Sequence, residues 1–211
     1  MTPAAMTLEQ LREAIPEYAR DLKVNLQTTL QSETLSAAQR WGVAVCAAGA
    51  AGNARLRDAL IEEARKEVGG GGSTGSTSSV RLGSPEPPRA GLTAGVIEDA
   101  LAAVAMMGMN NIFYRFRHLV DKPEYAQKPA RLRMTRIAKP ATNKLDFELF
   151  CLVVSAINGC EACVRAHENT ATQAGLSQDA VHDAIRIAAT VHGVAVALEL
   201  PHVADANPAA A

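Results

Sequence analysis

The sequence predicts an all-α protein built as a helical bundle. Hydrophobic residues make up 48% of its 211 residues and aromatic residues only 4%, and this alanine-rich, aromatic-poor composition favours closely packed helices. Helix-start residues precede the apolar segments, and glycine or proline follows them. A weak internal repeat indicates two copies of one helical unit. We therefore expect one helical domain or two small helical halves.

The first half is expected to contain five helical segments. Thr7 and Ser36 are suitable helix caps, and Pro16 divides the first segment into two short helices. Gly52-Asn53 ends one apolar helix, and the next is amphipathic with a charged outer face. The expected helices are residues 7–31, divided in two, and 36–50, 53–68 and 93–116.

The second half begins with a polar, irregular segment over residues 121–139. An apolar helix over residues 145–157 follows, and Asn158-Gly159 ends it, because glycine after asparagine is a turn signal. A helix over residues 160–174 is closed by Gly175. The last helix starts after Ser177 and runs to about Leu200, where Pro201 stops it.

The internal repeat divides the chain into units. Residues 43–56 echo residues 150–163 with an offset of 107, and residues 92–101 echo 176–185 with an offset of 84. The offsets differ by 23, the length of the Gly/Ser- and Pro-rich tract 69–91, which is expected to be a flexible insertion. The predicted organisation is a first helical repeat of residues 1–68 plus 92–140, the insertion 69–91, a second repeat of residues 141–200, and a frayed tail of residues 201–211.

Charge and targeting signals narrow the class of protein. The formal net charge is −1, and no basic patch favours nucleic acid. The N-terminus has no basic region followed by an apolar core, and no charge-free apolar stretch reaches spanning length. We therefore expect a cytoplasmic protein with no membrane and no nucleic-acid partner. In that compartment a Cys-x-x-Cys pair indicates redox or metal chemistry.

Reactive side chains concentrate in the second repeat. Cys160 and Cys163 are placed at a helix N-terminus, where unpaired N–H groups and the helix dipole favour a thiolate. His167 lies one turn after Cys163 on the same face and can exchange a proton with it. Glu148 is an acid within the preceding apolar helix, where a charge needs a partner. These four side chains form a candidate chain for thiol and proton transfer.

Other readings of the same residues are possible. The two cysteines, His167 and Glu148 could ligate zinc, but no second cysteine pair or His-x-His run offers a closed structural site, so no metal is expected. No βαβ pattern indicates a thioredoxin fold, and no histidine directly follows the second cysteine as in a c-type haem site. Cys46 and Cys151 lie in apolar runs and are expected to be buried. His192, in an Ala/Val run, is expected in the core or an interface.

The spacing Glu148-x11-Cys160-x2-Cys163-x3-His167 resembles the alkylhydroperoxidase D family, within the carboxymuconolactone decarboxylase-like superfamily. The segments from Ile15-Pro-Glu-Tyr to Leu26, Met107 to Arg115, and Leu132 to Met134 also resemble this family. The resemblance covers nearly the whole chain, except residues 69–91 and about the last ten.

The resemblance implies a thiol peroxidase that reduces organic hydroperoxides to alcohols. Cys163 would be the peroxidatic cysteine and pass through a sulfenic acid. Cys160 would be the proton donor and the more exposed, resolving cysteine, which closes the Cys160–Cys163 disulfide and exchanges with partners. Glu148 and His167 would form the proton relay.

The resemblance also implies partners. No cofactor would be bound, and dihydrolipoamide would be the reducing substrate, carried by a lipoyl-bearing acyltransferase and regenerated by dihydrolipoamide dehydrogenase. The family also passes electrons to a peroxiredoxin of the alkyl hydroperoxide reductase C type, and homotrimers are typical. Some members have a histidine directly before the second cysteine, where this chain has Ala162. That departure leaves open an alternative function, a disulfide-exchange adaptor that reduces the peroxiredoxin with little peroxidase activity of its own.

Overall fold

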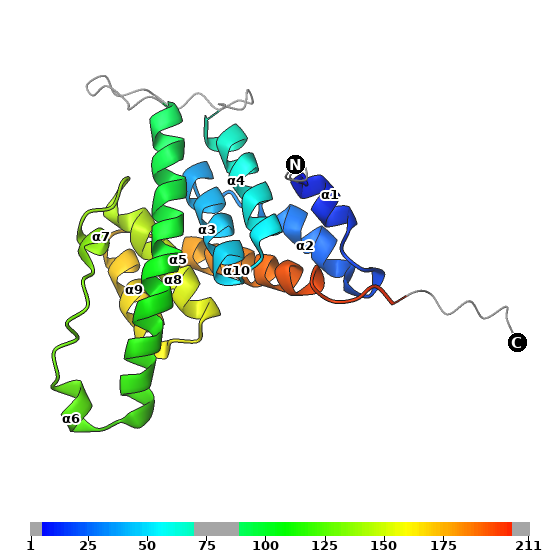
Figure 1. Cartoon of the computed structure of the whole chain (residues 1–211). Helices are drawn as coiled ribbons and strands as arrows, with labels where there is room; N and C mark the ends of the chain where they lie inside the picture. The colour runs from blue at the N-terminus through cyan, green and yellow to red at the C-terminus, as the bar shows by residue number, and fades with distance from the viewer. Residues whose placement is uncertain (1–5, 70–88, 204–211) are drawn as a thin grey trace, which may run out of the picture.

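The structure is a computed structural model that describes residues 6–69 and 89–203. Every regular element in these ranges is a helix, which confirms the all-α prediction. Figure 1 shows them grouped around the long helix α5. The elements are α1 (Leu8–Glu13), a 3₁₀ turn (Glu17–Ala19), α2 (Asp21–Thr29), α3 (Ala37–Ala50), α4 (Ala54–Gly69), α5 (Arg89–Val120), α6 (Pro123–Ala126), α7 (Thr135–Ala138), α8 (Lys144–Ile157), α9 (Glu161–Gln173) and α10 (Gln178–Ala197).

The helix starts follow from local capping. The Thr7 and Ser36 side chains each accept a hydrogen bond from the backbone N–H three residues on, and a glutamine at that position bonds back to the cap residue. These reciprocal capping boxes satisfy N–H groups that a helix start otherwise leaves unpaired. The Ser177 side chain caps α10 in the simpler way. As expected from Pro16, α1 ends before it and α2 begins after the 3₁₀ turn.

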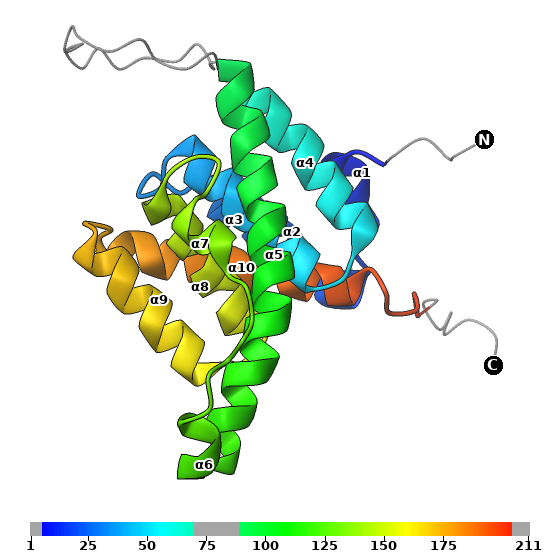
Figure 2. The ribbon, with the colours of Figure 1, turned by 60° about the vertical axis from the view of Figure 1, so that its left-hand side comes forward.

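Two helices lie at the centre of the bundle. Helix α3 contacts α4, α5, α8 and α10, and α8 contacts α9, α5, α3 and α10. Figures 1 and 2 both show α5 extending beyond this group, with α6 at its far end. The buried core is mainly aliphatic, with three large aromatic side chains, Phe147 and Phe150 from α8 and Trp41 from α3. The central helix α8 therefore connects the core to the α9 hairpin that carries the cysteine pair.

Helices α3 and α8 approach closely at Gly42. A Cβ atom at this position would lie 2.2 Å from Cζ of Phe150, far inside the usual carbon contact distance of about 3.5–4.0 Å. Glycine is therefore required here by the packing of the two central helices.

Helix α10 is tied to the segment between α2 and α3 through Asp183. Its Oδ2 accepts hydrogen bonds from Ser32 Oγ at 2.7 Å and Thr34 Oγ1 at 2.8 Å, and its Oδ1 accepts one from Arg186 at 2.8 Å. These hydrogen bonds lower the pKa of Asp183 to about 2, and the bond from Ser32 has the largest effect. The ionised carboxylate therefore stabilises this junction.

Some boundaries differ from the expectation. Helix α4 ends at Gly69, and α5 begins at Arg89 and ends at Val120, so Gly69 and residues 89–91, assigned to the flexible insertion, are helical. The reason is local, since no proline follows Pro88 in this segment and the helix can start directly after it. Residues 70–88 and 204–211, the rest of the insertion and most of the predicted tail, lie outside the described residues. The division into two repeats stays a prediction.

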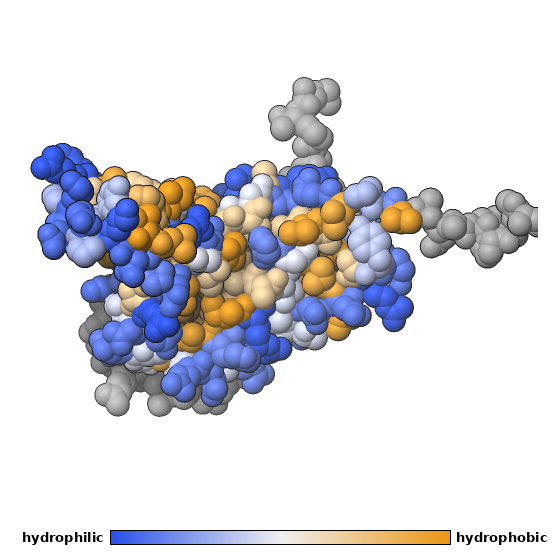
Figure 3. Space-filling view, turned by 90° about the horizontal axis from the view of Figure 1, so that it is seen from below, coloured by the Kyte–Doolittle hydropathy of each residue, from blue (hydrophilic) through white to orange (hydrophobic). Residues whose placement is uncertain are grey.

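Helix α5 is long and apolar enough to cross a membrane by length and composition alone, but it contains Glu98 and Asp99, so it does not contradict the expectation that no charge-free stretch reaches that length. Among the described residues, Thr93–Val120 qualifies as one candidate span of 28 residues, with 39% of its most apolar window buried. It also carries the fully buried Asp99, which is paired with Arg136, as expected of a core helix in a folded bundle. Its outer face exposes Ile112, Phe116 and Leu119. Figure 3, seen from the α6 end, shows such apolar surface between polar regions.

Candidate functional site

The turn between α8 and α9 positions the cysteine pair. Gly159 has a φ of 66°, the left-handed conformation that favours glycine. Its N–H donates to the carbonyl of Ala156 at 3.1 Å, and the N–H of Cys160 donates to the carbonyl of Ser155 at 3.0 Å. This is the Schellman arrangement that ends a helix. Cys160 thus completes the end of α8 and is also the N-cap of α9.

Cys160 and Cys163 are joined by a disulfide, with their Cα atoms 5.3 Å apart. Cys163 is the third residue of α9, so it lies in the first turn, where the positive end of the helix dipole favours a thiolate after reduction. The expectation that Cys160 is the more exposed cysteine is wrong in this structure, because Cys160 is 0% exposed and Cys163 7%. The reason is the position of Cys160 inside the turn, between the ends of two packed helices.

Glu148 and His167 form a buried pair. His167 Nδ1 lies 2.6 Å from Glu148 Oε2, and the two side chains are 13% and 6% exposed. With Glu148 ionised, the Nδ1–H donates to the carboxylate and leaves Nε2 able to accept or return a proton. The contact expected from the sequence is therefore present, and it fixes the orientation of the imidazole on the same face of α9 as Cys163.

A small cavity opens beside Cys163 and His167. Its volume is about 210 Å³, and its remaining lining residues are Asn110, Tyr114, Met134, Ile137, Ala162 and Ala166. Most of these side chains are apolar, and they come from α5, α9 and the segment around α7. The cavity is smaller than the about 300–1,000 Å³ that drug-sized ligands occupy, so it suits a small molecule with an apolar group.

The chain is similar to known proteins over almost its full length. Residues 123–206 match the model of the carboxymuconolactone decarboxylase family. The chain is 55% identical over 204 residues to alkyl hydroperoxide reductase AhpD of Anaeromyxobacter dehalogenans strain 2CP-C, covering 97% of each protein. It is 44% identical to the AhpD of Solibacter usitatus, covering 97% of this chain and 100% of that protein. The chain belongs to the AhpD family.

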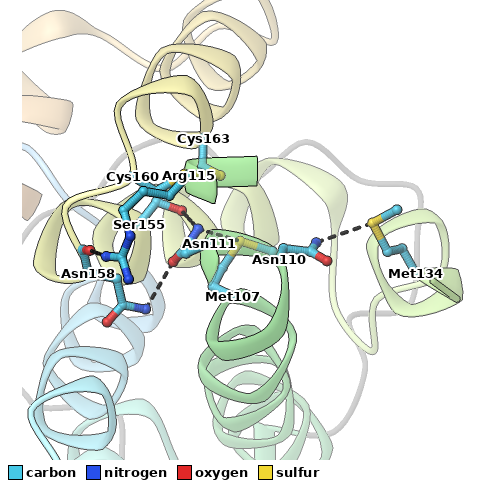
Figure 4. Close-up of a disulfide and its surroundings, with 9 residues drawn as sticks. All are labelled: Met107, Asn110, Asn111, Arg115, Met134, Ser155, Asn158, Cys160 and Cys163. Carbon is cyan, nitrogen blue, oxygen red and sulfur yellow. Dashed lines mark hydrogen bonds between the residues drawn. A yellow bond between two sulfur atoms is a disulfide. The ribbon is translucent and has the colours of Figure 1, made fainter. Parts of the chain in front are cut away.

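A buried polar network holds the turn of this AhpD-family site against α5 (Figure 4). Asn111 Nδ2 donates to Ser155 Oγ at 2.9 Å, and Asn158 Nδ2 donates to Asn111 Oδ1 at 2.9 Å. The Arg115 guanidinium donates to the carbonyl of Asn158. Sequence reasoning did not anticipate this network. Two adjacent asparagines within an apolar helix were the available signal.

A second buried group holds the outer wall of the AhpD-family cavity. Asp99, which is 0% exposed, accepts from the Arg136 guanidinium at 2.8 Å and from the backbone N–H groups of Ala141 and Thr142, each at 2.8 Å. Arg136 belongs to α7, which carries the lining residue Ile137. Asp99 therefore anchors the segment that closes one side of the cavity, and the sequence alone did not indicate this role.

The remaining candidates lie away from the AhpD-family site or take no part in it. His192 is exposed on the outer face of α10, so it is not in the core, and its expected place in an interface stays a prediction. Cys46 and Cys151 are free and buried as expected, and burial raises the pKa of both thiols. Among residues 6–69 and 89–203, no three histidine, cysteine or acidic side chains are grouped as metal ligands.

Proposed function

We propose that this protein is a thiol peroxidase that reduces organic hydroperoxides to alcohols. The observation that carries the proposal is the cysteine pair at the N-terminus of α9, beside the Glu148–His167 contact and an apolar cavity. The relatives named alkyl hydroperoxide reductase AhpD support the same chemistry. The apolar lining suits a hydroperoxide with an organic substituent.

The proposed cycle starts from the reduced pair. The Cys163 thiolate attacks the terminal peroxide oxygen, so an S–O bond forms, the O–O bond breaks, and Cys163 becomes a sulfenic acid. The leaving alkoxide takes a proton that comes from the Cys160 thiol through His167 and Glu148 and leaves as the alcohol. The Cys160 thiolate then attacks Cys163 sulfur, the disulfide forms, and hydroxide leaves and is protonated to water.

The reductant in this proposal is dihydrolipoamide. Its two thiols exchange with the Cys160–Cys163 disulfide and restore both protein thiols, while lipoamide is formed. A lipoyl-bearing acyltransferase would present this group, and dihydrolipoamide dehydrogenase would regenerate it, so the protein itself would bind no cofactor and no metal. We place this cycle in the cytoplasm, without a nucleic-acid or membrane partner.

A homotrimer is part of the same proposal. Apolar side chains on the outer face of α5, including Ile112 and Leu119, are exposed in the single chain, and exposed apolar stripes are typical of subunit contacts. Sedimentation equilibrium of the purified protein tests the assembly. A mass of one chain at micromolar concentration would rule out the trimer and leave the chemistry of the site unaffected.

A coupled assay tests the peroxidase. NADH oxidation is followed with dihydrolipoamide dehydrogenase, lipoamide, cumene hydroperoxide and the full chain, with Cys163→Ser as the matched control. We expect turnover that the control lacks. Equal rates for the two proteins would reject Cys163 as the peroxidatic residue.

A second candidate function is a disulfide-exchange adaptor for a peroxiredoxin of the alkyl hydroperoxide reductase C type. Ala162 favours it, because a methyl group lines the cavity where some family members have a histidine of the relay. The two functions separate when peroxide consumption is measured with dihydrolipoamide alone and again with the peroxiredoxin added. Consumption only after the addition would favour the adaptor.

A further inference from the structure

Asn110 is a buried amide with one end unused. It lies on α5, is 3% exposed, and its Nδ2 donates to Met134 Sδ at 3.2 Å. Within the described residues its Oδ1 has no hydrogen-bond partner although it is shielded from solvent. Buried polar atoms are nearly always paired, so an unpaired carbonyl oxygen beside a cavity points to a ligand.

The contact with Met134 determines which end of the amide is free. A thioether sulfur can accept a hydrogen bond but has no proton to donate. The NH₂ group must therefore face Met134, and the carbonyl oxygen is left as an unused acceptor. The neighbouring Asn111 is different, because both its Nδ2 and its Oδ1 are bonded to residues of the α8–α9 turn. Figure 4 shows the two side chains leaving α5 in different directions.

Asn110 is one of the residues that line the cavity containing the reactive sulfur. Asn110, Cys163 and His167 all line it, and most of the other lining side chains are apolar. In the neutral imidazole of His167, Nε2 is an acceptor, and the Cys163 thiolate is an acceptor as well. Neither group can therefore donate a hydrogen bond to Asn110 Oδ1. A molecule that brings its own O–H group and an apolar substituent satisfies the amide oxygen and fills the cavity.

We propose that Asn110 Oδ1 accepts a hydrogen bond from the O–H of a small organic hydroperoxide and directs its terminal oxygen toward Cys163. This rests on the proposed peroxidase function. The hydrogen bond persists through the step, because the same O–H group becomes the O–H of the Cys163 sulfenic acid as the S–O bond forms and the O–O bond breaks. The alkoxide leaves toward His167 and is protonated to the alcohol.

The test isolates the first chemical step in the full chain. In a Cys160→Ser background the alkoxide takes its proton from solvent water through His167, and the sulfenic acid of Cys163 cannot close the disulfide. Formation of this sulfenic acid by cumene hydroperoxide is followed in a single turnover by trapping and mass spectrometry, and all rates are compared with the Cys160→Ser parent. Asn110→Leu removes the acceptor at similar volume, and Asn110→Ala does so without adding bulk. Gly108→Ala is the control, since it changes an exposed position of α5 that does not line the cavity, and an added Cβ there would meet no described atom within 4 Å.

A second reagent separates substrate binding from general damage. Dithiodipyridine, an aromatic disulfide, reacts with the same Cys163 sulfur but has no O–H to donate. We expect both Asn110 variants to slow oxidation by cumene hydroperoxide about tenfold, the size of one lost hydrogen bond. Their reaction with dithiodipyridine should change less than twofold, and Gly108→Ala should oxidise at close to the parent rate.

Three other results of these experiments would each reject either the role of Asn110 or the peroxidase function itself. Unchanged oxidation by cumene hydroperoxide in both Asn110 variants would overturn the role of Asn110 and leave the peroxidase intact. Equal slowing with both reagents, or the same loss in Gly108→Ala, would assign the effect of the Asn110 variants to packing of α5 and also overturn the role of Asn110. No sulfenic acid in the Cys160→Ser parent and no peroxide turnover by the wild-type chain, with dithiodipyridine still reacting, would reject the peroxidase function and this inference with it.

Discussion

The contact between Gly42 and Phe150 makes a strong prediction about stability. Gly42→Ala would place a Cβ atom 2.2 Å from Cζ and 2.5 Å from Cε1 of Phe150. Because Cζ lies on the axis about which the ring turns, a ring flip does not move it. Phe150 is fully buried, so relief needs a shift of more than about 1 Å between α3 and α8 to restore ordinary contact.

The magnitude follows from two opposing effects. Overpacking of this kind costs about 1–3 kcal/mol, and replacing a helical glycine by alanine returns up to about 1 kcal/mol. We expect Gly42→Ala to lose about 1–2 kcal/mol of unfolding free energy. For a chain of this length that lowers the melting temperature by about 2–8 °C.

Gly108 provides the matched control. It lies in α5, is exposed, and an added Cβ would meet no atom within 4 Å among the described residues. Gly108→Ala should therefore gain up to about 1 kcal/mol from helix propensity alone. Urea denaturation and thermal circular dichroism of both variants, at one protein concentration, measure the difference. Equal stabilities for the two variants would refute the argument that Gly42 is required by the α3–α8 contact.

Three further predictions concern the site, pH and the thiols. Glu148→Gln and His167→Gln should each lower peroxide turnover about 10²–10⁴-fold in the coupled assay, while disulfide reduction by dihydrolipoamide continues; wild-type turnover in either would remove that residue from the relay. The pKa of Asp183 is lowered to about 2 on folding, so its carboxylate stabilises the fold above about pH 4, and this contribution is lost as the pH falls toward 2. Asp183→Asn should therefore lower the free energy of unfolding by about 1–2 kcal/mol near neutral pH. A difference in urea midpoint between the wild type and this variant that does not narrow in acid would contradict this. Burial raises the pKa of the Cys46 and Cys151 thiols, so iodoacetamide should label neither in the folded, reduced protein. Mass spectrometry measures the labelling, and alkylated Cys46 or Cys151 would contradict the prediction.

Much of the fold could be predicted because its signals are local. The caps at Thr7, Ser36 and Ser177 act on backbone groups three residues away, and the helix end at Gly159 depends on neighbouring residues and one left-handed conformation. The sequence thus determined the start of most helices without information from distant segments.

The parts of the candidate site that could be predicted from the sequence are also those that are close together in the chain. Cys160, Cys163 and His167 follow one another on a single helix, so their spacing fixes their relation. Glu148 comes from the preceding helix of the same hairpin, and its contact with His167 could be anticipated because a buried carboxylate needs a partner.

Tertiary structure alone decided how that motif is surrounded. Asn111 meets Ser155, Arg136 meets Asp99, and Gly42 meets Phe150 across long stretches of chain, and no local pattern specifies which distant side chain will be the partner. The burial of Cys160 and the free carbonyl of Asn110 depend on the same packing. The sequence determined which side chains form the candidate site, whereas the packing of α5, α7 and α8 around them decided the cavity beside it.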